Sequence, residues 1–192
     1  MSAVHSETAV GRYLLDEDVS RFTVRAFATG FLSAMGHNPN IAIREFSGKV
    51  NFDPSAPAQA SLRLTIRADS LEVTDDISSK DRKEMEATMN EKLLETSIYP
   101  AITFESTGTS AESLGGGRYK IALKGNLSLH GVTRALPVTA QVTHNGDMLR
   151  AYGEFSILQS DFKLPSIQVA GGALKLKDEL KFTFDIVARK QE

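Results

Sequence analysis

Four histidines are the side chains in this sequence best suited to acid–base or metal chemistry: His5, His37, His130 and His144. His37 lies in a Gly-His-Asn turn, where an imidazole could contact a polar head group or exchange protons near pH 7. The simpler interpretation is that the His37 ring hydrogen-bonds the local backbone and stabilises the turn. We expect the same turn role for His130, and solvent exposure for His5 and His144. Their spacing fits no metal-ligand pattern, so we predict neither a metal site nor a cofactor.

Two acidic runs, Asp16-Glu17-Asp18 and Asp75-Asp76, could be interpreted as paired carboxylates. Adjacent residues of a strand point to opposite faces, so capping and solvation explain these runs better than a shared reaction. The sequence contains no cysteine and no Gly-x-Ser-x-Gly motif, which removes thiolate nucleophiles and the hydrolase elbow. We therefore predict no catalytic residue.

The elements that must position these side chains are mostly strands, and residues 119–143 show this most clearly. A period of two places one set of apolar side chains on a single face, and a second set follows the turn at Gly131. The two sets are Tyr119, Ile121, Leu123, Leu127 and Leu129, then Leu136, Val138, Ala140 and Val142. Two long alternating strands joined by a tight turn predict a β-hairpin.

The same alternation recurs along the chain, and Gly48 inside one such segment suggests a bulge or a sharp bend. The further alternating segments are 22–26, 41–52, 61–68, 101–107, 149–158 and 180–186. About eight half-buried strands with short turns predict an antiparallel sheet curled into a closed barrel, with a β-sandwich as the alternative. Aromatic residues beside glycines on the inner faces can line an apolar cavity or complete a dry core, and the pattern does not decide between them.

One helix is predicted after residue 77. Ser78-x-x-Asp81 resembles a capping box, and apolar residues then recur at helical spacing. They are Met85, Met89, Leu93 and Leu94. We expect this helix to pack on the barrel or cap one end, since methionine more often fills a core than forms a partner-binding groove.

Length and composition favour one domain, with a flexible arm at 1–12 and a single barrel at 13–192. A net charge of −2 offers no argument for nucleic-acid binding. No stretch reaches the roughly 20 apolar residues of a membrane span, and the first residues do not resemble a signal peptide. The sequence as written predicts a soluble, cytoplasmic protein; a periplasmic or secreted location stays open if the chain was trimmed. Homodimerisation also stays open.

Several motifs resemble the YceI-like family. The segment 125–134, GNLSLHGVTR, is similar to that family's G-x-L-T-x-H-G-V-T-K/R hairpin, and 99–106, YPAITFES, is similar to Y-P-x-I-x-F-x-S. Phe46-Ser47-Gly48 and Ser160-Asp161-Phe162 match shorter motifs in the same order. The chain departs from many relatives at 81–84, DRKE, and at Leu93-Leu94, where the family often carries Arg-Asp-x-His and an aromatic pair.

The resemblance implies a lipocalin-like antiparallel barrel with one helix, which binds an apolar small molecule such as a polyisoprenoid or fatty acyl or amide chain. We expect a non-catalytic binding protein; an enzyme that uses His37 as acid or base in the cavity is the alternative. A partner-binding protein with a filled core is the third hypothesis. The expected ligand-contacting residues are Phe46, Val50, Phe52, Leu64, Ile66, Phe104, Leu123, Leu127, Leu129, Phe155, Phe182 and Phe184.

Overall fold

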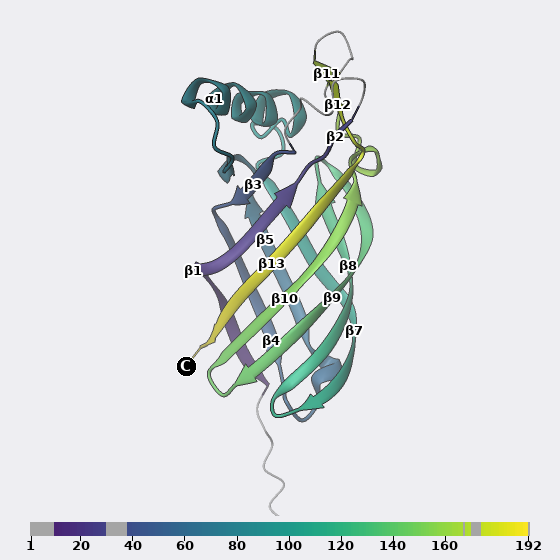
Figure 1. Ribbon diagram of the computed structural model, residues 1–192. Helices are drawn as coiled ribbons and strands as arrows, with labels where there is room; N and C mark the ends of the chain where they lie inside the picture. Colours follow the sequence, from purple (N-terminus) through teal and green to yellow (C-terminus); the bar gives the residue numbers. More distant parts are fainter. Residues whose placement is uncertain (1–9, 30–37, 167, 170–173, 192) are drawn as a thin grey trace, which may run out of the picture.

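The computed structural model describes residues 10–29, 38–166, 168–169 and 174–191 and shows a tall β-barrel (Figure 1). Eight antiparallel strands close on themselves in the order β13-β10-β9-β8-β7-β5-β4-β1, with β1 pairing back to β13. They are β1 (Gly11–Arg25), β4 (Phe46–Phe52), β5 (Ser61–Arg67), β7 (Ala101–Gly115), β8 (Arg118–Leu129), β9 (Val132–Asn145), β10 (Met148–Leu158) and β13 (Glu179–Lys190). The predicted closed antiparallel barrel is confirmed, and closure leaves these eight strands without a free edge.

The N-terminal strand begins earlier than the sequence predicts. Gly11 and Arg12 already pair with Phe52 and Asn51 of β4, two residues inside the predicted arm 1–12. Residues 1–9 lie outside the described part of the chain.

The segment 41–52 was predicted as one strand. In the structure it forms two separate strands, and the break between them begins at Arg44. β3 (Asn40–Ile43) pairs with the second half of β1 and with β6 (Leu71–Val73), whereas β4 pairs with the first half of β1 and with β5. Of the bulge or sharp bend expected at Gly48, the bulge is absent, because the β4–β5 register runs without a shift. A Cβ at Gly48 would instead lie 2.8 Å from Arg63 O, so glycine permits close approach of two strands.

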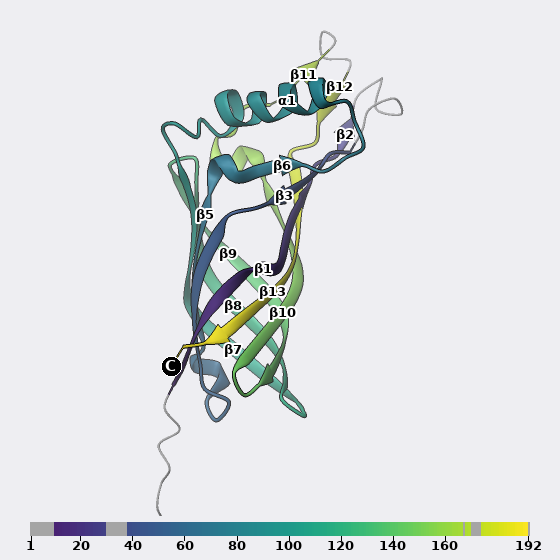
Figure 2. The same cartoon turned by 90° about the vertical axis from the view of Figure 1, so that its left-hand side faces the viewer.

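The two ends of the barrel differ. One end is closed by short turns, including Asn145-Gly146 and the 3₁₀ turn Pro57–Gln59. The other end carries the helix α1 (Ser79–Thr88) and a small sheet (Figures 1 and 2). That sheet is β2 (Ala28–Thr29), β12 (Leu174–Leu176) and β11 (Gln168–Val169); further 3₁₀ turns are Ala68–Ser70 and Gln159–Phe162.

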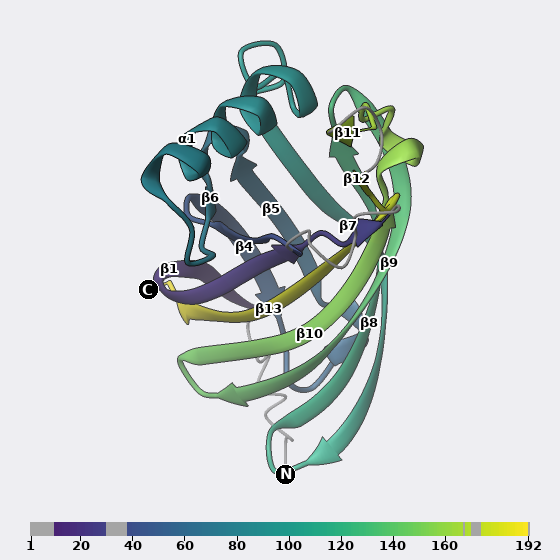
Figure 3. The ribbon, with the colours of Figure 1, turned by 45° about the horizontal axis from the view of Figure 1, so that its top comes forward.

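The helix begins where the sequence places it. Ser78 caps it, since Asp81 N donates to Ser78 Oγ at 3.1 Å while Ser78 Oγ donates to Asp81 Oδ2 at 2.7 Å. α1 continues into a π-helical turn, Met89–Leu93. Seen from above, the helix lies across one side of the barrel end (Figure 3). Within the described residues, no helix is long and apolar enough to cross a membrane.

Candidate functional site

The barrel encloses an apolar cavity of about 620 Å³, within the range of about 300–1,000 Å³ typical of small-molecule sites. Aliphatic and aromatic side chains from all eight barrel strands line it, and part of α1 lines its mouth. The open choice between a hollow and a filled interior is thus decided in favour of a cavity.

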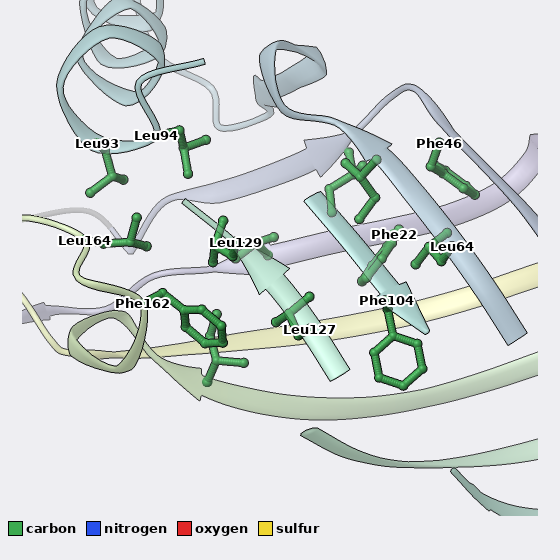
Figure 4. Packing of buried hydrophobic residues seen from close by; sticks show 14 of the residues in the cluster. Phe22, Phe46, Leu64, Leu93, Leu94, Phe104, Leu127, Leu129, Phe162 and Leu164 are labelled. Atoms are coloured by element: carbon green, nitrogen blue, oxygen red, sulfur yellow. The ribbon is translucent and has the colours of Figure 1, made fainter. Parts of the chain in front are cut away.

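The structure brings nearly all the predicted ligand-contacting side chains to this cavity. Phe46 is the exception: it is buried in the core and packs edge-on against Phe22, 6.3 Å between ring centroids, without lining the cavity. The residues that do line it are Val50, Phe52, Leu64, Ile66, Phe104, Leu123, Leu127, Leu129, Phe155, Phe182 and Phe184. Figure 4 shows several of them together with Leu93 and Leu94, which reach from the helical segment toward Leu129 and Leu164.

Several inner-face side chains of the barrel are only partly buried and border the cavity. Leu123, Val138 and Phe155 point inward yet are only half-buried, and all of them line the cavity. Ile121 and Ala140 line the same cavity nearer the closed end, where they are 4% and 5% exposed. The accessible surface of the half-buried set therefore faces the cavity.

Two glycines keep aromatic rings against the wall and out of the cavity. A Cβ built on Gly125 of β8 would lie 2.3 Å from the Phe104 ring, and one on Gly153 of β10 would lie 2.8 Å from the Phe184 ring. Each ring therefore occupies the space that a side chain on the neighbouring strand would fill. Because the rings lie over glycine, the volume beside them stays open.

Replacing Gly125 with Ala is expected to push the Phe104 ring into the cavity. The distance between the new Cβ and the Phe104 ring is shorter than any normal contact. We therefore expect a loss of about 1–3 kcal/mol in unfolding free energy, as for other overpacked cores. Chemical denaturation measures that loss, and fluorescence of an apolar dye measures the smaller cavity. Gly108→Ala on β7 is the matched control, since its Cβ meets no atom within 4 Å; equal stability losses in the two variants would contradict the argument.

The closed end of the barrel contains a buried polar contact beneath the cavity floor. Tyr13 is 2% exposed; its hydroxyl donates to Gly146 O at 3.0 Å and lies 3.0 Å from His144 Nε2. His144 is half-buried and its ring packs against Phe52, 5.3 Å between centroids, so it is less exposed to solvent than predicted. The Asn145-Gly146 turn folds this histidine back over the barrel end. Tyr13, Phe52, Tyr119 and His144 form a plug, called the floor plug below.

Burial of the Tyr13 hydroxyl, assisted by the negative charge of Asp147, raises its pKa above the ordinary 10.0. Just above pH 10 the folded protein therefore keeps a proton that the unfolded chain loses. The contribution of Tyr13 to the free energy of unfolding is intact below pH 10 and is lost as pH rises through the folded pKa. We expect Tyr13→Phe to lower stability by about 1 kcal/mol at neutral pH. We also expect it to flatten the decline of stability above about pH 10.

Denaturant titrations across the alkaline range measure both effects. Tyr152→Phe is the matched control, because that tyrosine is 48% exposed and donates only to Gln141 on the surface. An alkaline decline that is as steep in Tyr13→Phe as in the wild type would contradict the assignment to Tyr13.

The mouth of the cavity carries its polar lining, which lies mainly on α1. Asp81, Glu84 and Thr88 line the cavity from the helix, and Gln159 and Lys175 line it from the far side of the chain. Their carboxylate, hydroxyl, amide and ammonium groups can hydrogen-bond a polar head group, whereas the walls below are almost entirely apolar. The sequence pattern missed Asp81, Glu84 and Thr88 because polar positions on a helix are normally expected to face solvent.

The helix itself packs lightly over the mouth. Two contacts tie it to the chain near β6: Val73 N donates to Glu86 Oε1 at 3.0 Å, and Arg82 Nη2 donates to Asp75 O at 2.9 Å. α1 has no fully buried side chain, and Met85 of the predicted stripe is 36% exposed. The rest of that stripe, Met89, Leu93 and Leu94, is buried in the core. The predicted capping helix is thus anchored through the turn that follows it.

His130 occupies the tip of the β8–β9 hairpin and has a structural role. Its φ of 51° lies in the left-handed region, and its Nε2 lies 2.7 Å from Glu95 Oε2 at the end of the helical segment. The Tyr99 ring packs on the imidazole at 4.6 Å, in space that Gly131 leaves free. His130 does not line the cavity, which agrees with the expected turn role.

The remaining candidates do not form a reactive cluster. Asp75 accepts hydrogen bonds from Asn40 N and Nδ2, both at 2.9 Å, and Asp16 pairs with Arg189, which lowers the Asp16 pKa. Neither acidic run lines the cavity. His37 lies outside the described residues. Among the described residues, no group of three or more His, Cys, Asp or Glu side chains could hold a metal ion.

Known sequences agree with this architecture. The YceI-like domain profile matches residues 13–188. A UPF0312 protein of Shewanella baltica is 28% identical over 132 residues, which is 68% of this chain and 64% of that protein. A UPF0312 protein of Azotobacter vinelandii is 26% identical over 54% of this chain and 48% of its own length. The matched region thus spans less than two thirds of these relatives.

Solved structures share the fold at low sequence identity. BcnA of Burkholderia cenocepacia superposes with a TM-score of 0.70 at 23% identity, covering 90% of this chain and 98% of that one. A polyisoprenoid binding domain from Saccharophagus degradans gives a TM-score of 0.68 at 15% identity, covering 93% and 98%. At these identities the likeness concerns the fold.

Proposed function

Because this chain belongs to the YceI-like domain family, we propose that it is a non-catalytic binding protein that holds a long apolar molecule inside its barrel. The ligand class is a polyisoprenoid or a fatty acyl or amide chain. The observation that carries this proposal is the apolar cavity of about 620 Å³ inside the closed barrel. A structural relative described as a polyisoprenoid binding domain supports the same class.

The energetics favour a long ligand with few polar groups. Each methylene transferred from water to an apolar site contributes roughly 0.8 kcal/mol, so a chain of many carbons binds tightly without specific hydrogen bonds. The only polar requirement is a place for the head group, and the cavity mouth supplies it at Asp81, Glu84 and Gln159. The walls around Leu127 and Phe104 are almost entirely apolar.

Extraction of the purified protein tests the proposal. We expect organic extraction and mass spectrometry to recover an apolar chain from protein isolated from cells, and the delipidated protein to bind an added polyprenol. The polyprenol should be recovered chemically unchanged after incubation. Failure of both the native extract and the added polyprenol would overturn the binding proposal, and conversion of the polyprenol to a new mass would overturn its non-catalytic part.

A further inference from the structure

One polar side chain is buried in the wall of the cavity. Gln159 is 6% exposed, and of the two buried polar side chains in the described part of the chain it is the one that lines the cavity. The other, Ser70, lies away from the cavity, and its hydroxyl donates to Arg67 O at 2.7 Å. Gln159 begins the 3₁₀ turn that follows β10, across the barrel end from α1 (Figure 3). Its position continues the inward alternation of Phe155 and Ile157.

Hydrogen bonds fix the orientation of the Gln159 amide. Its Nε2 donates to Lys177 O at 2.8 Å, and its backbone N donates to Asp178 O at 2.8 Å. Leu164 N donates to Gln159 O at 3.1 Å, so the backbone is held on both sides. Turning the amide over would place Oε1 against the Lys177 carbonyl, which is also an acceptor. Nε2 therefore belongs on Lys177 O, and Oε1 is the atom left for another partner.

The Gln159 Oε1 has no hydrogen-bond donor within the part of the chain that the structure describes. The polar side-chain atoms sealed there without a partner are Arg82 Nε, Asn90 Oδ1 and His130 Nδ1, so Gln159 Oε1 keeps accessible surface. Because the side chain is buried and lines the cavity, that surface faces the cavity. An unpaired carbonyl oxygen in an apolar site costs free energy, and a donor on a bound ligand removes that cost.

The other polar groups on the cavity are less able to discriminate between ligands. Asp81 and Glu84 are exposed, so a bond from the ligand to either replaces a bond to water and contributes little. Ser61 Oγ already accepts from Asn51 Nδ2 at 2.9 Å. A buried polar group that a ligand leaves unpaired rejects that ligand far more strongly. From this we infer that Gln159 determines specificity, by selecting apolar chains that carry an O–H or N–H donor over chains that carry none.

This inference rests on the proposed function and deepens it, because it names the polar group of the ligand. An alcohol or an amide of the proposed chain class carries the required donor. A hydrocarbon or an ether of the same length does not, and it leaves Gln159 Oε1 unpaired inside the cavity.

Titration of the delipidated protein with geranylgeraniol and with its methyl ether tests the inference. The two ligands share one chain and differ in the hydroxyl donor. Their Kd ratio, ether over alcohol, is compared between the wild type and Gln159→Met, so that the different hydration of the two ligands cancels. Methionine keeps the length of the side chain and removes the amide. We expect the ratio to be about ten-fold larger in the wild type, the effect of one buried hydrogen bond.

Gln141→Met is the matched control. Gln141 is exposed on the outer face of β9 and accepts from the Tyr152 hydroxyl, so its replacement should leave the Kd ratio at the wild-type value. A wild type that binds neither ligand contradicts the proposed function. A wild type that binds both, with the same ratio in Gln159→Met, overturns the role of Gln159 alone.

A crystal structure of the wild type with geranylgeraniol decides the question if Gln159→Met does not fold by circular dichroism. The hydroxyl oxygen of the ligand should lie about 2.5–3.0 Å from Gln159 Oε1. A bound ligand with its hydroxyl anywhere else, including at the carboxylates of α1, overturns the inference.

Discussion

Replacing Phe52 with Ala is expected to lower the free energy of unfolding by about 3–5 kcal/mol, the range for removal of a fully buried phenylalanine. Phe52 is 1% exposed and contacts the rings of Tyr119 and His144, each at 5.3 Å between centroids. Its removal leaves a void between the floor plug and the cavity. Few neighbouring atoms can move to fill that void, because the strands around it are hydrogen-bonded on both sides.

Denaturant unfolding measures this loss, and Phe27→Ala is the control. Phe27 is half-buried, lies near the mouth and contacts the charged ends of Arg25 and Lys177 at 5.6 and 5.9 Å. Its truncation should cost clearly less. A loss below about 1 kcal/mol for Phe52→Ala would mean that the closed end is not a packed plug.

A carboxylate inside the cavity is expected to abolish ligand binding near neutral pH. Leu127 is 8% exposed, lines the cavity and pairs with Phe104 across the β7–β8 ladder. Asp at this position would be ionised in water but costs several kcal/mol to bury unpaired. The apolar surroundings raise its pKa, so binding of an added polyprenol should be lost at pH 7 and partly recovered as the pH falls and the carboxyl takes up a proton.

Asn126→Asp is the matched control for Leu127→Asp. Asn126 is the preceding residue of β8 and is exposed on the outer face, so the same charge there should change polyprenol affinity little. Fluorescence titration with the polyprenol at several pH values compares the two variants. Equal affinity in both at pH 7 would show that the ligand does not contact the wall at Leu127, and would place the binding site elsewhere.

The predictions from strand periodicity held where a residue's face was the only question. Alternation in 119–143 identified Leu123, Leu127 and Leu129 as inward-facing, and the barrel places all of them on the cavity. It could not separate Phe46 from them, because Phe46 also faces inward but is covered by Phe22. Alternation reports which face a side chain occupies; what fills the space beyond that face depends on residues far away in the chain.

The polar sites were harder to predict, because their contacts join distant segments. His144 was predicted to be exposed beside a turn, yet it is half-buried and its Nε2 lies 3.0 Å from the hydroxyl of Tyr13, 131 residues away in sequence. Asp81 was predicted only as part of a capping box and Glu84 was assigned no role, yet the position of α1 over the barrel end brings both to the cavity mouth. No local spacing encodes either contact.

Local periodicity and turn residues predicted the antiparallel strands, the capped helix and the inner face of most strands, with a closed barrel favoured over a β-sandwich. Only the tertiary structure shows that the barrel is closed and that its interior is hollow. The physical reason is packing. Whether Phe104 fills the barrel or lies against its wall depends on Gly125 on the neighbouring strand.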